Sequence, residues 1–208
     1  MDRRHLLALG ASSALTVALP AAAQSPLSAE DAALVESARE HLQSLSSVRG
    51  RFNQTDARGQ RSAGAFSLKR PGRVRFEYDQ PSRLIVTADG TNVLVWDRRL
   101  RTFDRYPLGA TPLDLFIGRE IRLDRGVTVE RVSRGGDSFT IHARGRRRQD
   151  GRIELTFAES PVRLRGWTVI DAQNRATRVS LSDLQPASLS NDIFILRPPR
   201  SERNGGRS

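Results

Sequence analysis

Few side chains in this 208-residue chain could take part in acid–base, nucleophilic or metal chemistry. There is no cysteine, which excludes thiol nucleophiles, thiolate metal ligands and disulfides. Apart from His5, the histidines are His41, in an amphipathic segment, and His142, in a basic one. Neither has a second ligand at metal-binding spacing, and the chain has no Gly-x-Ser-x-Gly signature. Asp89 and Asp171 stand in sequences typical of turns. We therefore expect neither an enzyme nor a cofactor or metal site.

Residues 1–23 have the three parts of a secretory signal peptide. Arg3 and Arg4 are followed by a weakly apolar run over 6–19 and by an A-x-A cleavage site at 21–23. This run is shorter than the roughly 20 residues that a membrane-spanning helix needs. We expect export by the Sec or the twin-arginine route, a mature chain that begins near Gln24, and a periplasmic location. Because a bacterial lipoprotein carries its lipid on a cysteine after the cleavage site, we expect no lipid anchor.

The charge of the chain also bears on its partners. Lys plus Arg number 34 against 23 Asp plus Glu, a formal net charge of +11, and Lys69 is the only lysine. Such an excess would suit a phosphate backbone, but export argues against a nucleic-acid partner. Two interpretations remain: a solvated arginine-rich surface, and attraction to anionic lipid headgroups or acidic partner proteins.

The first element expected to position a site is a helix that begins at Ser28. Ser28 and Asp31 have the spacing of a capping box, and apolar residues then recur at spacings of four, four and three. These apolar residues are Leu34, Ala38, Leu42 and Leu45. The helix therefore has one apolar stripe, which must lie on an apolar surface.

The remainder of the chain reads as short strands separated by turn signals, which predicts an antiparallel barrel, half-barrel or sandwich. The candidate strands are 48–55, 60–69, 73–78, 84–88, 92–96, 101–106, 127–132, 138–143, 152–157, 163–170, 176–184 and 193–197. Residues 111–117 interrupt them with a predicted short apolar helix. A hydrophobic content of 38% suits one core, so we expect one domain over 24–198 and a disordered basic tail over 199–208.

The most informative strand is 73–78, in which Val74, Phe76 and Tyr78 alternate with charged residues and share one face. Here the chain resembles the outer-membrane lipoprotein carrier (LolA) family. The resemblance runs in collinear order over nearly all of the mature chain, and its most specific piece is the Arg-Pro dipeptide before the alternating aromatic strand. The matching segments are 48–54 (VRGRFNQ), 64–78 (GAFSLKRPGRVRFEY), Pro81, 88–90, 95–97, 111–113, 169–171, Phe194 and Pro198.

The resemblance implies a mainly β fold: a single antiparallel sheet curved into an incomplete barrel, with the N-terminal helix and the short internal helix as a lid. It also implies a monomeric periplasmic carrier of acylated lipoproteins. An inner-membrane lipoprotein-releasing ABC transporter would load the carrier, and an outer-membrane receptor would accept the cargo. The arginine that latches the lid would be Arg70, and Val74 stands where the family usually has an aromatic residue.

The apolar residues on the matching segments are the candidates for lining a lipid-binding cavity. For the wall we name Phe52, Phe66, Leu68, Val74, Phe76, Leu84, Val86 and Trp96, and for the lid Leu113, Leu115 and Phe116. Each could equally be ordinary core.

Two alternatives from other classes remain open. One is an exported polyanion-binding module that uses Arg144, Arg146, Arg147 and Arg148. The other is a β-rich sensor of the envelope that binds no lipid.

Overall fold

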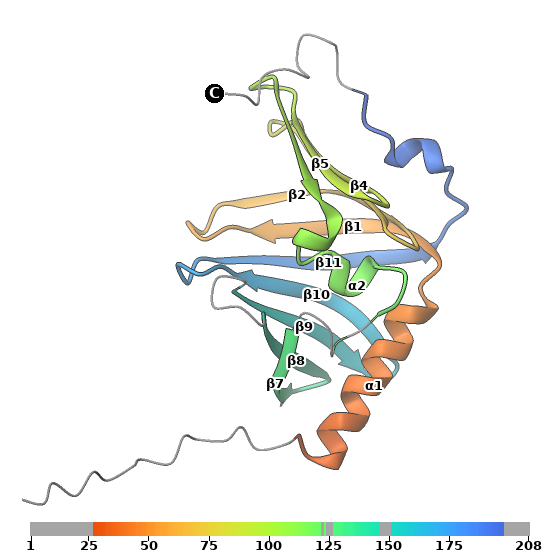
Figure 1. Ribbon diagram of the computed structural model, residues 1–208, viewed down its shortest axis with the longest axis vertical. Coiled ribbons are helices and arrows are strands. Elements are labelled where there is room, and N and C mark those ends of the chain that lie inside the picture. Colours follow the sequence, from red (N-terminus) through yellow and green to blue (C-terminus); the bar gives the residue numbers. More distant parts are fainter. Residues whose placement is uncertain (1–26, 122, 124–126, 146–150, 198–208) are drawn as a thin grey trace, which may run out of the picture.

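The computed structural model describes residues 27–121, 123, 127–145 and 151–197 (Figure 1). The predicted signal peptide, residues 1–23, and the predicted tail, 199–208, lie outside these ranges. The described residues form one 11-stranded antiparallel sheet with the strand order β6-β5-β4-β3-β2-β1-β11-β10-β9-β8-β7. Within these ranges, no helix is long and apolar enough to cross a membrane.

The sheet is curved but not closed, because β6 and β7 remain as its two edges. This confirms the prediction of a mainly β, incomplete barrel. The first strand, β1, lies at its centre between β2 and the last strand, β11. The strands are β1 (Ser47–Thr55), β2 (Arg61–Lys69), β3 (Arg73–Tyr78), β4 (Leu84–Asp89), β5 (Asn92–Asp97), β6 (Thr102–Pro107), β7 (Val127–Gly135), β8 (Ser138–Gly145), β9 (Arg152–Glu159), β10 (Val162–Ile170) and β11 (Ala176–Pro186).

The N-terminal helix α1 (Ala29–Ser44) forms as its capping and apolar signals predict. The Ser28 hydroxyl accepts a hydrogen bond from the Asp31 N–H at 3.0 Å, which satisfies one of the free donors of the first turn. On the apolar stripe, Ala38 and Leu42 are fully buried, while Leu34 and Leu45 pack against the core. The helix thus lies across the concave side of the sheet, against β10 and β7 (Figure 1).

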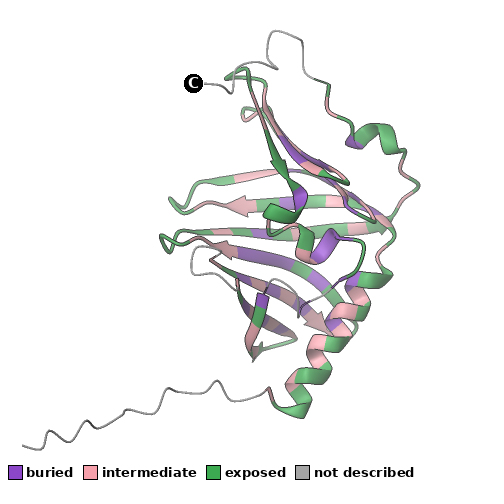
Figure 2. Ribbon diagram, in the orientation of Figure 1, coloured by how far each residue is buried: buried purple, intermediate pink, exposed green. Residues whose placement is uncertain are grey.

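The interval between β6 and β7 contains a 3-10 helix, η1 (Leu108–Ala110), and a single helical turn, α2 (Asp114–Ile117). The predicted helix over 111–117 is therefore present, although its regular part begins at Asp114. Phe116 and Ile117 are buried, with 4% and 0% of their surface exposed. Figure 2 shows this buried side of α2 in front of the middle strands. Helix α2 consequently covers the concave face beside α1.

The outer face of β3 and β4 is covered by a second 3-10 helix, η3 (Asn191–Phe194). Phe194 is fully buried, and the Thr87 hydroxyl lies 2.9 Å from the Val74 carbonyl and 3.3 Å from the Phe194 carbonyl. The predicted strand over 193–197 was therefore wrong. The Ser190 hydroxyl accepts a hydrogen bond from the Asp192 N–H and caps a helical turn. This turn packs Phe194 against the outer face of the sheet.

Gly64 in β2 leaves room on the inner face for the Phe52 ring, which is its partner in β1. A Cβ atom at Gly64 would stand 2.1 Å from the Glu77 carbonyl oxygen and 2.6 Å from the Phe52 ring. Because backbone would have to move, we expect Gly64→Val to lower the free energy of unfolding by about 3 kcal/mol in urea denaturation. The control is Gly135→Val, since a Cβ at Gly135 meets no atom within 4 Å. Equal losses in the two variants would contradict this account.

Candidate functional site

The concave face of β1, β2 and β3 carries a continuous aromatic and aliphatic wall. Phe66 pairs with Phe76 and Leu68 with Val74, so both pairs share a face. Phe52 joins them from β1, with its ring centroid 5.2 Å from that of Phe76. All five side chains are buried, with exposed fractions between 0% and 6%. The structure therefore brings together five of the eight residues that the sequence predicts for the wall.

The other three predicted wall residues lie on β4 and β5 and divide between the two faces. Val86 pairs with Phe76, and Leu84, two residues earlier, shares its inner face. Trp96 pairs with Ile85, which places it on the outer face, opposite to the wall. The prediction that Trp96 lines the same surface therefore disagrees with the register. Since η3 also buries part of the outer face, the run over 93–96 is apolar on both sides and does not reveal which side is inner.

Trp167 in β10 also belongs to this inner wall, although it is not among the residues predicted for it. It is 6% exposed, and its ring centroid lies 6.0 Å from that of Phe76 and 4.8 Å from that of Phe116. A β-bulge between Leu164 and Gly166 shifts the alternation of the strand, so Leu164 and Trp167 both face inward. No simple period-2 pattern predicts this orientation.

The lid residues close the concave face from the other side. Phe116 packs on Trp167, while Leu113 and Leu115 are partly buried against the core. The Gly72 N–H, in the turn between β2 and β3, donates a hydrogen bond to the Ile117 carbonyl at 2.6 Å. In this structure the lid therefore occupies the apolar face with its own side chains.

Arg70 joins the two lid elements. Its guanidinium donates to the Leu42 carbonyl in α1 at 2.5 Å, and to the Gly118 and Arg119 carbonyls after α2 at 2.9 and 3.1 Å. Leu42 is among the last four residues of the helix, whose carbonyls lack partners within the helix and favour a positive charge. Partial burial lowers the pKa of Arg70, yet a guanidinium remains charged. One fixed cation thus bridges two separate elements above the concave face.

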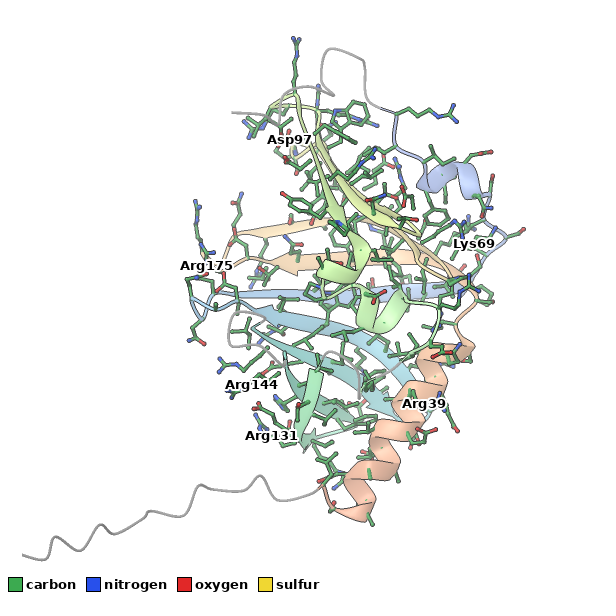
Figure 3. The ribbon with its side chains drawn as sticks, in the orientation of Figure 1. Arg39, Lys69, Asp97, Arg131, Arg144 and Arg175 are labelled. Atoms are coloured by element: carbon green, nitrogen blue, oxygen red, sulfur yellow. The ribbon has the colours of Figure 1, made fainter. Side chains whose placement is uncertain are left out.

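A polar cleft of about 1110 Å³ lies at the rim of the sheet opposite to Arg70. It is bordered by Tyr78, Leu84 and Asp97. Figure 3 shows the two rims: Lys69, next to Arg70, lies on the side of the molecule that α1 occupies, and Arg175 lies across from it. The Tyr78 hydroxyl donates to the Gln54 side chain at 2.8 Å, and burial raises the pKa of Tyr78 to about 12. The hydroxyl at the end of the wall is therefore neutral at physiological pH.

Polar clusters on the outer face hold strands together. His142 lies 2.8 Å from the Ser133 hydroxyl and 3.1 Å from the Glu154 carboxylate, so one imidazole links β7, β8 and β9. These partners lie on other strands, and the local sequence motifs did not indicate them.

Arg144, which was predicted as part of a polyanion site, forms an ion pair with Glu130 at 2.7 Å. Arg146, Arg147 and Arg148 lie outside the described residues.

An open antiparallel half-barrel, with an apolar inner face under helices that Arg70 joins, defines a class of lidded half-barrel proteins. The family model described as "Outer membrane lipoprotein carrier protein LolA" matches residues 43–197. The chain belongs to this family, as the sequence resemblance predicted.

Curated relatives named outer-membrane lipoprotein carrier protein support the assignment. The chain is 31% identical to that of Chromohalobacter salexigens over 193 residues, which cover 86% of this chain and 85% of the relative. It is 29% identical to that of Leptothrix cholodnii over 158 residues, 71% and 73% of the two chains.

Solved structures share the fold at low sequence identity. The structure of MucB has a TM-score of 0.52 at 13% identity, covering 82% of this chain and 64% of MucB. An uncharacterized conserved protein from Thermus thermophilus has a TM-score of 0.50 at 9% identity, over 81% and 94% of the two chains.

Proposed function

We propose that this protein is a monomeric periplasmic carrier, without enzymatic activity, for the acyl chains of lipoproteins. It receives them from an inner-membrane lipoprotein-releasing ABC transporter, shields them against the concave face, and delivers them to an outer-membrane receptor. The observation that carries this proposal is the Arg70 bridge, because it fastens a lid of two elements over an apolar wall.

The energetics of acyl chains explain why such a lid is useful. Each buried methylene contributes about 0.8 kcal/mol, so a chain of about a dozen contributes about 10 kcal/mol. A carrier that retained all of this free energy would not release its cargo. Here an acyl chain must displace Phe116 from Trp167 and break the Arg70 contacts, so that only the difference appears as affinity.

The test uses the purified mature chain with a synthetic lipopeptide that bears a triacylated N-terminal cysteine, and with the same peptide without acyl chains. We expect the acylated peptide to co-elute with the protein in size-exclusion chromatography and the bare peptide to elute separately. Displacement of Phe116 should also change the emission of Trp167, which can be followed in a Trp96→Phe background because the chain has two tryptophans. Failure to retain the acylated peptide, or equal retention of both peptides, would contradict the proposal.

A further inference from the structure

The last turn of α1 is hydrogen-bonded through three consecutive residues to three separate parts of the fold. His41 Nε2 accepts from the Leu164 N–H in β10 at 3.1 Å. The Leu42 carbonyl accepts from Arg70, and Gln43 Oε1 accepts from the Ile121 N–H at 3.1 Å. Sheet, latch and lid segment therefore meet at this turn, which we call the α1 junction (His41, Leu42 and Gln43).

The contact of His41 with the sheet depends on the bulge in β10. Strand β11 pairs with β10 only from Gly166 onward, so the Leu164 N–H has no partner in that strand. His41 supplies an acceptor instead, and its ring meets the Phe157 ring edge-on at 6.4 Å and 89°. The imidazole is thus fixed both by packing and by a backbone donor.

This contact requires a neutral imidazole, because Nε2 accepts through its lone pair. Burial lowers the pKa of His41, and the positive charge of Arg163 in β10 lowers it further. Other charged groups around α1 are engaged elsewhere: Arg165 pairs with Asp137, Arg134 with Glu30 and Asp31, and Arg39 with Glu36. Glu40, on the same helix, forms no ion pair with His41 within the described residues. Protonation of His41 would place an N–H on Nε2 opposite the Leu164 N–H, close to the positive charge of Arg163.

Gln43 connects the last turn of α1 to the segment that follows α2. Its partner, Ile121, is 2% exposed and follows the Gly118 and Arg119 carbonyls that Arg70 binds. The segment after α2 is therefore held from two directions, by the guanidinium and by the amide of Gln43. Loss of the helix position would weaken both contacts, because Leu42 and Gln43 move with the same turn.

We propose that His41 and Gln43 are positioning residues of the lid: neutral His41 holds the α1 junction against β10, Gln43 transmits that position to Ile121, and protonation of His41 loosens the lid. This rests on the proposed function only in giving the lid a role in cargo release. The hydrogen-bond junction itself can be tested without any lipoprotein.

The test is amide hydrogen exchange by NMR on the mature chain, expressed as protection factors at about pH 7.5 and about pH 4, because the pKa of His41 is lowered by burial and by Arg163. In the unmodified protein we expect protection of the Leu164 and Ile121 amides to fall by about tenfold at the lower pH, the loss of about one hydrogen bond. In His41→Gln, whose amide oxygen can replace Nε2 and does not titrate, protection should not depend on pH. In His41→Phe, which retains packing on Phe157, Leu164 should be weakly protected at both pH values.

A further variant separates the two positioning residues. Gln43→Leu should reduce protection of the Ile121 amide and leave that of Leu164 unchanged. The proposal is overturned if protection of Leu164 is the same in His41→Phe as in the unmodified protein, or if Ile121 does not follow Leu164 when the pH falls. If the exchange results hold but the acylated peptide fails to bind, the junction stands and the carrier proposal falls.

Discussion

Arg70→Leu is expected to bind acylated lipoprotein and then to pass it on about 100-fold more slowly to an outer-membrane acceptor. Leucine removes the donors to the Leu42, Gly118 and Arg119 carbonyls, and the closed lid loses about 3 kcal/mol relative to the open, loaded state. The closed, empty state is then no longer stable enough to compete with the loaded state and drive release. Transfer is measured as the appearance of lipoprotein on the acceptor over time after mixing with loaded carrier.

The matched control is Arg73→Leu. Arg73 lies in the same turn region, but its guanidinium contacts only the Pro71 carbonyl, at 3.4 Å, among the described hydrogen bonds. This variant should transfer cargo at the normal rate. Arg70→Lys should be intermediate, because an ammonium group lacks the planar fork with which arginine reaches two elements at once. Normal transfer by Arg70→Leu would refute the role of this residue as the latch.

Trp167→Ala should lower the free energy of unfolding by about 3–5 kcal/mol, the usual loss for truncating a buried large aromatic residue. Trp167 packs against Phe76 in the wall and Phe116 in the lid, so its removal also frees the lid from the sheet. The measurement is urea denaturation followed by far-ultraviolet circular dichroism, which does not depend on tryptophan emission.

Trp96→Ala provides the comparison, because it removes the same side chain from the opposite face. Trp96 is only partly buried, and the Arg98 guanidinium lies 4.8 Å from its ring centroid. We expect a loss of about 1–2 kcal/mol and unchanged binding of the acylated peptide, because this side chain does not touch the inner wall. A loss as large as that of Trp167→Ala would show that the outer face matters as much as the inner one.

The sequence predicts those parts of the fold that depend on regular alternation. Val74, Phe76 and Tyr78 alternate with charged residues, and the register places them on one face. The Arg-Pro dipeptide before them points to Arg70, whose guanidinium contacts both lid elements; its role as a latch stays a prediction. Ser28 likewise marks the start of α1. In these segments one face is apolar and the other polar, so the local pattern indicates which side chains face the core.

The remainder depends on contacts that no local pattern records. Trp96 lies in a run that is apolar on both faces because η3 covers the outer one. The inward orientation of Trp167 comes from a bulge, which inserts one residue into the alternation. His41 and Gln43 accept hydrogen bonds from backbone N–H groups more than 70 residues away. Because residues of every type except proline carry this N–H, the residue type does not reveal which one takes part.

The pairing of β1 with β11 has a consequence for how the molecule reaches its folded state. The two strands at the centre of the sheet come from opposite ends of the described chain, so the middle of the structure cannot assemble until Ala176–Pro186 has been synthesised. This distant pairing raises the contact order, which slows folding, whereas the other adjacent strands of the sheet are consecutive in the sequence. A nascent chain that ends before β11 consists of two disconnected β-meanders with unpaired inner edges. The edges of β1 and β10 therefore stay open to pairing with other chains until β11 lies between them.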